Sequence, residues 1–268
     1  MTSNDAVLLS ITDQIATITL NRPDRMNALD QSMIKGFGTA LDQIEAEIAN
    51  IGAVIIEGSG GTFMAGGDVK FFYELSQNPA EESRPLIETM INRVHDIIIR
   101  LTALPRPVIA KLEGAVAGFG ISLMNACDLA VAAEETVFTL AYIHIGTSPD
   151  GGSTHSLPRL VGMKKAKEIA FLGDRFTATD AHECGLVNKV VPADQLASAT
   201  AKYATRLAAG PRDALARTKA LLNTAPENDL AKQLAREAAA FADCAGSHDF
   251  REGVSAFVEK RSPQFGKS

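Results

Sequence analysis

Two glycine-rich stretches decide the fold of this chain: Phe63-Met-Ala-Gly-Gly-Asp68 and Gly114-Ala-Val-Ala-Gly-Phe-Gly120. Each follows a short apolar run typical of a buried strand and precedes a segment that we expect to be helical. Small residues let a ligand approach the backbone closely, and the first N–H groups of a helix have no intrahelical acceptor. Two such N–H groups aimed at one point would form an oxyanion hole. The alternative is that these glycines serve only tight turns and close packing.

The sequence around these stretches alternates between strand-like and helical patterns. The runs expected to be strands are Ala6–Ile11, Ile15–Leu20, Ala53–Ile56, Pro107–Leu112, Leu129–Ala132, Val137–Leu140 and Val187–Val191. The expected helices are Asp30–Ile48, a helix from about Ser83 to Leu101, Leu157–Leu172, Thr179–Cys184, Ala193–Ala208, Pro211–Leu222 and Asn228–Ala245. The order predicts an α/β core over residues 1–195 and a helical region over residues 196–268, packed together.

The composition is that of an ordinary globular protein. The chain has 268 residues, a formal net charge of −6, 46% hydrophobic residues and 22% charged residues. An acidic balance argues against nonspecific binding of nucleic acid, which needs a basic face. No apolar run approaches the roughly 18 residues that span a bilayer. Because the first residues, Met1 to Ala6, do not have the pattern of a signal or transit peptide, we expect a cytoplasmic location.

Signatures of other chemistries are missing from the sequence. The three cysteines, Cys127, Cys184 and Cys244, form no C-x-x-C pair, so we expect reduced, buried or half-buried thiols. The five histidines show no metal-ligand spacing, and the chain has neither a P-loop nor a complete dinucleotide fingerprint. We therefore predict no metal and no nicotinamide cofactor.

An ordered set of motifs resembles the crotonase (enoyl-CoA hydratase/isomerase) superfamily over nearly the whole chain. The motifs that carry the resemblance are Asn21-Arg-Pro-Asp-Arg-Met-Asn-Ala-Leu29, residues 63–70, Pro107-Val-Ile-Ala110, residues 114–120, Leu157-Pro-Arg-Leu-Val-Gly162, residues 181–187 and residues 251–261. The resemblance implies a spiral of β-β-α units with a helical C-terminal trimerisation region, assembled as a trimer or a hexamer. It also implies an acyl-CoA thioester substrate, so that coenzyme A enters as part of the substrate and no separate cofactor is needed.

Site residues follow from the same resemblance. The oxyanion hole would consist of the backbone N–H groups of Gly67 and Phe119. The residues implied to line the path of coenzyme A are Arg25, Met26, Ala28, Ala65, Asp68, Val69 and Lys70. Arg25 and Lys70 would meet phosphates, the alternative being ordinary solvated surface charges. Phe257 and Lys260 match a position that reaches coenzyme A in the same or a neighbouring subunit.

The reaction depends on the acid/base positions. Hydratases of this superfamily use two glutamates, whose positions here hold the substrate-pocket residues Ser122 and Tyr142, which counts against hydratase activity. Asp150 matches the position of a catalytic aspartate in certain enoyl-CoA isomerases and aryl-CoA dehalogenases, although Pro-Asp-Gly-Gly is also a turn sequence. We expect Asp150 to shift the double bond of an enoyl-CoA. The alternatives are an enoyl-CoA hydratase, a dehalogenase-like enzyme with Asp150 as nucleophile and His95 or His144 as base, and a non-catalytic acyl-CoA-binding homologue.

Apolar stripes on the C-terminal helices predict that these helices need a partner surface. The stripes consist of Leu196, Tyr203 and Leu207 on one helix and Leu230, Leu234 and Ala238 on another. Closed rotational symmetry would cover them, which agrees with the trimer or dimer of trimers that the resemblance implies.

Overall fold

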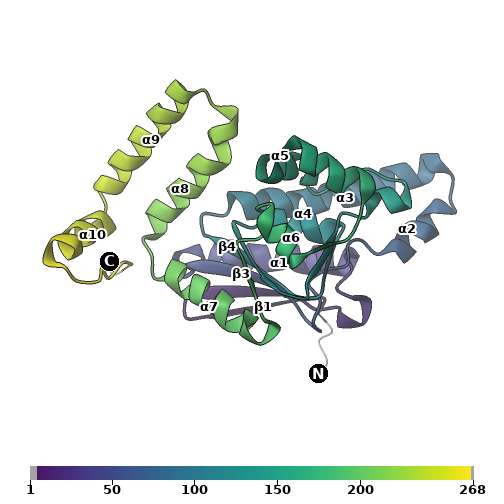
Figure 1. The fold of residues 1–268 in the computed structure, drawn as a ribbon, viewed down its shortest axis with the longest axis horizontal. Helices are drawn as coiled ribbons and strands as arrows, with labels where there is room; N and C mark the ends of the chain where they lie inside the picture. The colour runs from purple at the N-terminus through teal and green to yellow at the C-terminus, as the bar shows by residue number, and fades with distance from the viewer. Residues whose placement is uncertain (1–4, 267–268) are drawn as a thin grey trace.

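A six-stranded sheet forms the centre of the molecule in a computed structural model that describes residues 5–266 (Figure 1). Its strands, in spatial order, are β1 (Val7–Thr12), β2 (Ile15–Leu20), β3 (Ala53–Gly58), β4 (Val108–Leu112), β6 (Leu129–Ala133) and β9 (Lys189–Val191). Only β1 and β2 pair antiparallel, and all other neighbours are parallel. The expected strands are therefore confirmed, with the last one shortened at its start. Met1 to Asn4, part of the stretch that suggested a cytoplasmic location, lie outside the described residues.

A second, three-stranded sheet consists of β5 (Ala115–Ala117), β7 (Val137–Thr139) and β8 (Phe176–Thr177). Its first strand is the middle of the second glycine-rich stretch. The chain thus moves repeatedly from the large sheet to the small one through a short turn and returns by a helix. This winding is the expected spiral of β-β-α units.

Helices cover both faces of the large sheet. The helices before the C-terminal third are α1 (Gln31–Ala46), α2 (Val69–Ser76), α3 (Ala80–Ala103), α4 (Phe119–Asn125), α5 (Ser153–Leu172) and α6 (Ala178–Glu183). Helix α1 lies over β1 and β2 and buries six residues, among them Phe37, Leu41 and Ile44. As expected, the Asp30 carboxylate caps α1, accepting from the Met33 N–H at 2.9 Å. None of the helices within residues 5–266 has the length and apolar character to span a membrane.

The boundaries of α3 and α5 differ from the predicted ones. Helix α3 starts at Ala80, and the N–H groups of Glu82 and Ser83 donate to the carbonyl of Pro79 at its start. The Ser83 hydroxyl donates to the carbonyl of Leu75 and ties this helix to the end of α2. Helix α5 starts at Ser153 and is interrupted at Gly162, where φ is 76° and ψ is 158°. The spacing of apolar residues along the sequence does not predict this interruption at Gly162.

The expected partner surface of α7 (Ala193–Ala208) lies within the chain itself, so this part of the prediction was wrong. Leu196, Ala204 and Ala208 are buried on the face of the large sheet that β3, β4 and β6 present. The boundary expected between residues 195 and 196 falls inside α7. Where the domains divide stays a prediction, and in the structure the chain leaves the core near Gly210.

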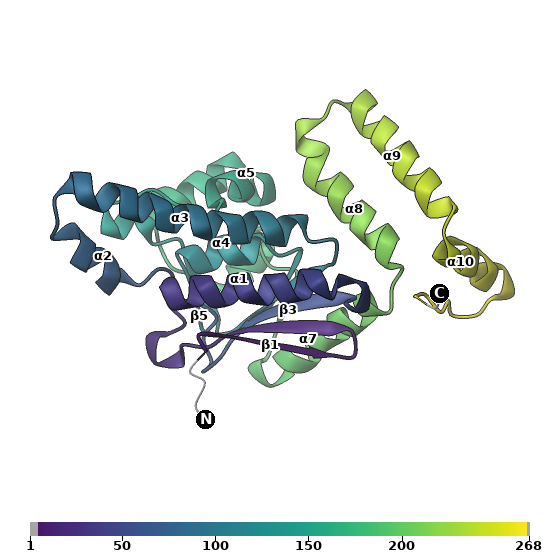
Figure 2. The same cartoon turned by 180° about the vertical axis from the view of Figure 1, so that it is seen from behind.

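Three further helices stand apart from the core and form what we call the C-terminal arm: α8 (Arg212–Thr224), α9 (Leu230–Ala245) and α10 (His248–Glu259) (Figure 2). Helix α10 was not predicted. Neither α8 nor α9 contains a buried residue in the single chain. Large apolar side chains are exposed on all three helices: Leu222, Leu230, Leu234, Phe241, Val254, Phe257 and Val258.

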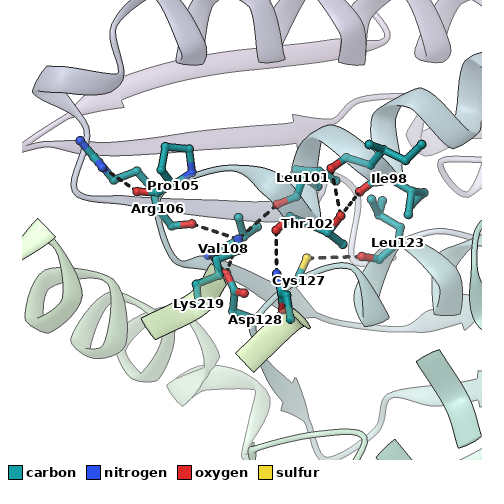
Figure 3. A network of polar contacts seen from close by, with 12 residues as sticks. Ile98, Leu101, Thr102, Pro105, Arg106, Val108, Leu123, Cys127, Asp128 and Lys219 are labelled. Carbon is teal, nitrogen blue, oxygen red and sulfur yellow. Dashed lines mark hydrogen bonds and ion pairs between the residues drawn. The ribbon is translucent and has the colours of Figure 1, made fainter. Parts of the chain in front are cut away.

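A buried ammonium group fastens the arm to the core (Figure 3). The Lys219 Nζ of α8 donates to Asp128 Oδ2 at 2.7 Å and to the carbonyls of Leu101 and Arg106 at 3.2 Å each. Burial raises the pKa of Asp128, and the Lys219 charge opposes that rise. The same carboxylate accepts from the Val108 N–H at the start of β4, so one acid joins the arm to the sheet.

Candidate functional site

The two glycine-rich stretches lie against each other, as expected. Met64 donates its N–H to the Ala115 carbonyl at 3.0 Å and accepts from the Ala117 N–H at 2.8 Å. A Cβ atom added to Gly120 would lie 2.6 Å from the Met64 carbonyl oxygen, closer than real Cβ atoms approach backbone. Gly118, the residue before α4, has a φ of 51° and a ψ of −119°, a conformation that requires glycine. The glycines therefore serve the close packing of two backbone segments.

This packing leaves two backbone donors without acceptors. Gly67 pairs with Leu29 in a parallel bridge, in which Leu29 bonds to the Gly66 carbonyl and the Asp68 N–H. In that geometry the N–H of Gly67 points away from Leu29. Among residues 5–266, neither this N–H nor that of Phe119, the first residue of α4, donates to a protein acceptor. Unpaired backbone donors at a closely packed junction are the groups that a ligand oxygen would use.

Asp150 lies in a partly buried cluster with Ser122 and Tyr142. The Tyr142 hydroxyl donates to Asp150 Oδ1. Burial raises the pKa of Asp150, whereas the Tyr142 hydrogen bond and the nearby His95 act in the opposite direction. Burial and the Asp150 charge raise the pKa of Tyr142, so Tyr142 stays protonated and remains a donor. Asp150 is thus a carboxylate of increased basicity whose position is fixed by a neutral phenol.

The backbone of Asp150 is fixed as firmly as its side chain. Its carbonyl oxygen accepts from Ser122 Oγ at 2.9 Å, from Ser153 Oγ at 3.0 Å and from the Ser153 N–H at 3.3 Å. A Cβ atom added to Gly151 would lie 2.7 Å from both the Phe119 ring and Ser122 Cβ. Helix α4 therefore carries one free N–H at its first residue and, one turn later, the serine that anchors the Asp150 loop.

The structure distinguishes the two histidines that could assist Asp150. His95, on α3, has its Nε2 atom 3.3 Å from the N–H of Gly151, the residue after Asp150. The ring of His144 is held elsewhere, with Nε2 3.0 Å from the Gly173 carbonyl oxygen. Only His95 is placed beside the Asp150 loop.

The residues expected to bind coenzyme A fall into one connected region. Ala65 donates its N–H to the Met26 carbonyl at 3.0 Å, which joins the loop before α1 to the first glycine-rich stretch. Arg25 and Lys70 are exposed and have no ion pair within residues 5–266. The exposed Met26 and Val69, together with the half-buried Ala28, complete this region. The Asp68 carboxylate caps α2, accepting from the Lys70 N–H at 3.2 Å.

Phe257 and Lys260 do not join this region of their own chain. Both lie at the end of α10, and α10 and α2 occupy opposite ends of the molecule in both views (Figures 1 and 2). Phe257 is 83% exposed. Of the two possibilities open in the sequence, contact with coenzyme A bound to the same subunit does not fit this geometry.

Two cavities border the Asp150 cluster. One, of about 690 Å³, runs along α3 from Ser76 to His95. The other, of about 800 Å³, lies between α3, α5 and α8, with Ser122 and Gly151 in its wall.

Within the described part of the chain, no three His, Cys, Asp or Glu side chains are grouped as metal ligands would be. The three cysteines are free and half-buried.

Sequence reasoning gave no role to Arg22, which has several contacts next to the site. Its guanidinium contacts the Ala28 carbonyl, Asp30 and Asp68. The available signal was the predicted helix cap at Asp30, since a cap carboxylate near an arginine suggests a pair. The partner from the other segment, Asp68, could be recognised only in the folded chain.

Comparisons with known proteins agree with this architecture. The model of the enoyl-CoA hydratase/isomerase family matches residues 10–268. The chain is 35% identical to the 1,2-epoxyphenylacetyl-CoA isomerase of Escherichia coli over 259 residues, 97% of each protein. It is 33% identical to the crotonyl-CoA hydratase of Syntrophomonas wolfei over 260 residues, again 97% of each. The crystal structure of an enoyl-CoA hydratase from Polaromonas superposes with a TM-score of 0.90 at 36% identity, covering 97% of this chain and 99% of that one.

Proposed function

Because the chain belongs to the crotonase (enoyl-CoA hydratase/isomerase) superfamily, whose members act on acyl-CoA, we propose that it shifts the double bond of an enoyl-CoA thioester. Asp150 is the acid/base of this proposal, and the N–H groups of Gly67 and Phe119 bind the thioester oxygen. The observation that carries it is that Ser122 and Tyr142 both contact Asp150. The two positions that hold glutamates in hydratases are occupied here by residues that fix one other carboxylate.

The reaction needs only one carboxylate. Ionised Asp150 removes a proton from C2 of a 3-enoyl thioester, and the negative charge moves to the thioester oxygen. Two backbone donors at that oxygen stabilise the dienolate more than the substrate, because the charge exists only along the reaction path. Asp150, now protonated, returns the proton at C4 and gives the 2-enoyl thioester. The raised pKa of Asp150 makes the carboxylate a stronger base for the first of these transfers.

Similarity to relatives does not decide between isomerisation and hydration. The Escherichia coli relative is named a 1,2-epoxyphenylacetyl-CoA isomerase. The relative from Syntrophomonas wolfei is named a hydratase at nearly the same identity. The residues around Asp150, rather than overall similarity, therefore support the choice of reaction.

Incubation with a 3-enoyl-CoA tests the proposal. Isomerisation keeps the mass of the thioester and creates the conjugated 2-enoyl absorption, whereas hydration adds the mass of water. Asp150→Asn is the matched control, because it keeps the shape of the side chain and removes the base. Addition of water at a rate equal to or above isomerisation contradicts the proposal, and so does isomerisation by Asp150→Asn at the native rate.

A second candidate is supported by the position of His95. In a dehalogenase-like reaction Asp150 attacks an activated aryl-CoA ring, halide leaves, and a base activates the water that hydrolyses the aryl ester. His95 is placed beside the Asp150 loop and would be the base that activates this water. Release of halide from a 4-halobenzoyl-CoA, lost in His95→Gln, would support this candidate over the isomerase.

Assembly and location complete the proposal. We infer a homotrimer or a dimer of trimers, because the exposed apolar side chains of α8–α10 are left uncovered in one chain. In such an assembly Phe257 and Lys260 would reach coenzyme A bound to a neighbour. The cytoplasmic location stays a prediction.

A further inference from the structure

Arg22 joins the starts of two helices that flank the candidate oxyanion hole. Its Nη2 atom lies 3.1 Å from Asp30 Oδ2 and 3.5 Å from Asp68 Oδ2. Asp30 caps α1 and Asp68 caps α2. The other amino group, Nη1, donates to the carbonyl of Ala28. The arginine side chain is only 18% exposed, so these contacts are partly shielded from solvent.

The backbone of Arg22 is held in place as well. Its N–H donates to Asn27 Oδ1 at 2.8 Å, and its carbonyl accepts from the Asn27 N–H at 2.9 Å. Asn27 is fully buried and donates through Nδ2 to the carbonyls of Ser59 and Thr62. Arg22 therefore starts from a fixed backbone, which reduces the entropy lost when its side chain is ordered.

These contacts surround the bridge that orients the Gly67 N–H. Ala28 and Asp30 flank Leu29, and Asp68 follows Gly67, so Arg22 contacts both chain neighbours of Leu29 and one neighbour of Gly67. If the two segments separate or slide, the N–H of Gly67 changes direction. Arg22 is the side chain that joins both segments across this bridge by charge.

We propose that Arg22 is a positioning residue that holds the Gly67 N–H toward the thioester oxygen by joining Ala28 to Asp68. The inference rests on the proposed oxyanion hole but not on the type of reaction. Lysine cannot replace arginine fully here, because its three N–H groups are on one nitrogen, whereas arginine uses Nη1 for the carbonyl and Nη2 for the carboxylates.

Infrared difference spectra of bound butyryl-CoA, labelled with ¹³C at the thioester carbonyl, test the proposal without turnover. Butyryl-CoA is saturated and has no double bond to move. In the native protein, hydrogen bonding at the oxygen lowers the carbonyl stretching frequency. We expect Arg22→Gln to lose most of this shift and Arg22→Lys to keep part of it. With a turned-over substrate, kcat should fall by up to about 10²-fold in Arg22→Gln, the scale of a misplacement of about 1 Å.

Arg100→Gln is the matched control. Arg100 also joins two elements through two carboxylates, pairing with Asp42 at 2.7 Å and Glu45 at 2.9 Å between α3 and α1. It has no contact with the glycine-rich stretches, so the carbonyl shift should equal that of the native protein. If Arg22→Gln does not fold, as judged by circular dichroism, Asp68→Asn removes the charge on one side and keeps a residue that caps helices. It should also reduce the shift.

The outcomes separate this inference from the proposed reaction. A native-size shift in both Arg22→Gln and Asp68→Asn overturns the role of Arg22. Absence of any shift in the native protein overturns the oxyanion hole and the inference with it. A native shift that is lost in Arg22→Gln, in a protein that fails to isomerise 3-enoyl-CoA, supports the inference and rejects the isomerase.

Discussion

Two regions of this chain differ in how far contacts within the chain cover their side chains. One consists of the glycine-rich stretches with the Asp150 loop, and the other is the C-terminal arm. Asp150 has its carbonyl bonded by Ser122 and Ser153 and its carboxylate bonded by Tyr142. In the arm, α8 and α9 bury no residue, and Phe241 remains 69% exposed. Contacts within the chain fix the geometry of the first region, whereas the second region leaves an apolar surface exposed in the single chain.

This difference predicts that mutations can disturb the proposed assembly without disturbing the proposed chemistry. The candidate donors and the carboxylate are positioned by bonds within one chain, so a change in the arm should leave their geometry intact. The exception is Phe257 with Lys260, which lies in the arm and is too far from its own chain's binding region. The arm should therefore influence affinity for coenzyme A rather than the chemical step.

Gly67→Pro is expected to have the largest effect. Proline has no N–H, so this change removes one donor to the thioester oxygen. Loss of one such donor lowers the rate by about 10²–10³. Steady-state turnover of the substrate, with circular dichroism and CoA affinity measured beside it, checks the result. An active proline variant would show that this N–H is not a catalytic donor.

Gly67→Ala is the matched control for the proline variant, since alanine keeps the N–H. Its Cβ atom would lie 2.8 Å from Cε2 of Phe72, so the ring at the edge of the site must move. We expect an active enzyme with a modest loss of rate. Equal inactivity of the alanine and proline variants would attribute the effect to crowding rather than to the donor.

Asp150→Asn should lower turnover of a 3-enoyl-CoA by at least about a hundredfold, the scale of general acid/base groups. Ser122→Ala is the comparison within the same cluster, because Ser122 bonds the carbonyl of Asp150 and Ser153 bonds it too. Ser122→Ala should lower the turnover of a 3-enoyl-CoA much less than Asp150→Asn does. Near-native turnover in Asp150→Asn would reject the acid/base role.

Tyr142→Phe should change the pH dependence more than the maximal rate. The hydrogen bond from Tyr142 lowers the pKa of Asp150, against the larger effect of burial. Without it the pKa rises further, and because the base must be ionised, the ascending limb of kcat/KM moves to higher pH. Activity at low pH is then lost first. Ser122→Ala is the control, because it removes no bond to the Asp150 carboxylate and should leave the ascending limb of the pH profile in place. An ascending limb that does not move in Tyr142→Phe would contradict the role of Tyr142.

Leu234→Glu should have the smallest effect on the site and a clear one on assembly. Leu234 is 53% exposed on α9, so a charge there can remain in water in the single chain but would disrupt the proposed apolar interface. Light scattering should give a trimer or hexamer for the native protein and a smaller particle for the variant. We expect kcat per chain to persist while KM rises, as neighbouring Phe257 and Lys260 are removed. A native particle with the mass of one 28.4 kDa chain would reject the assembly.

Much of the fold could be predicted because its signals are local. The strands of the large sheet and the cap at Asp30 follow from periodicity and capping chemistry. The approach of the two glycine-rich stretches to each other was expected from the family resemblance. The break at Gly162 and the destination of the α7 stripe could not be predicted in this way. A stripe such as that of Leu196 shows that a helix has an apolar face, but it does not say whether a sheet or a second chain covers it.

The sequence by itself determined the order of strands and helices in the α/β core. Its motifs, through their resemblance to the crotonase superfamily, added the spiral of β-β-α units and the candidate site residues Gly67, Phe119 and Asp150. Tertiary structure alone decided that Tyr142 and Ser122 meet at Asp150, that His95 rather than His144 accompanies it, and that Arg22 bridges Asp30 and Asp68. The physical reason is range. Propensity and capping act between residues close in sequence, whereas a hydrogen bond or ion pair across the fold exists only after packing has fixed both partners in space.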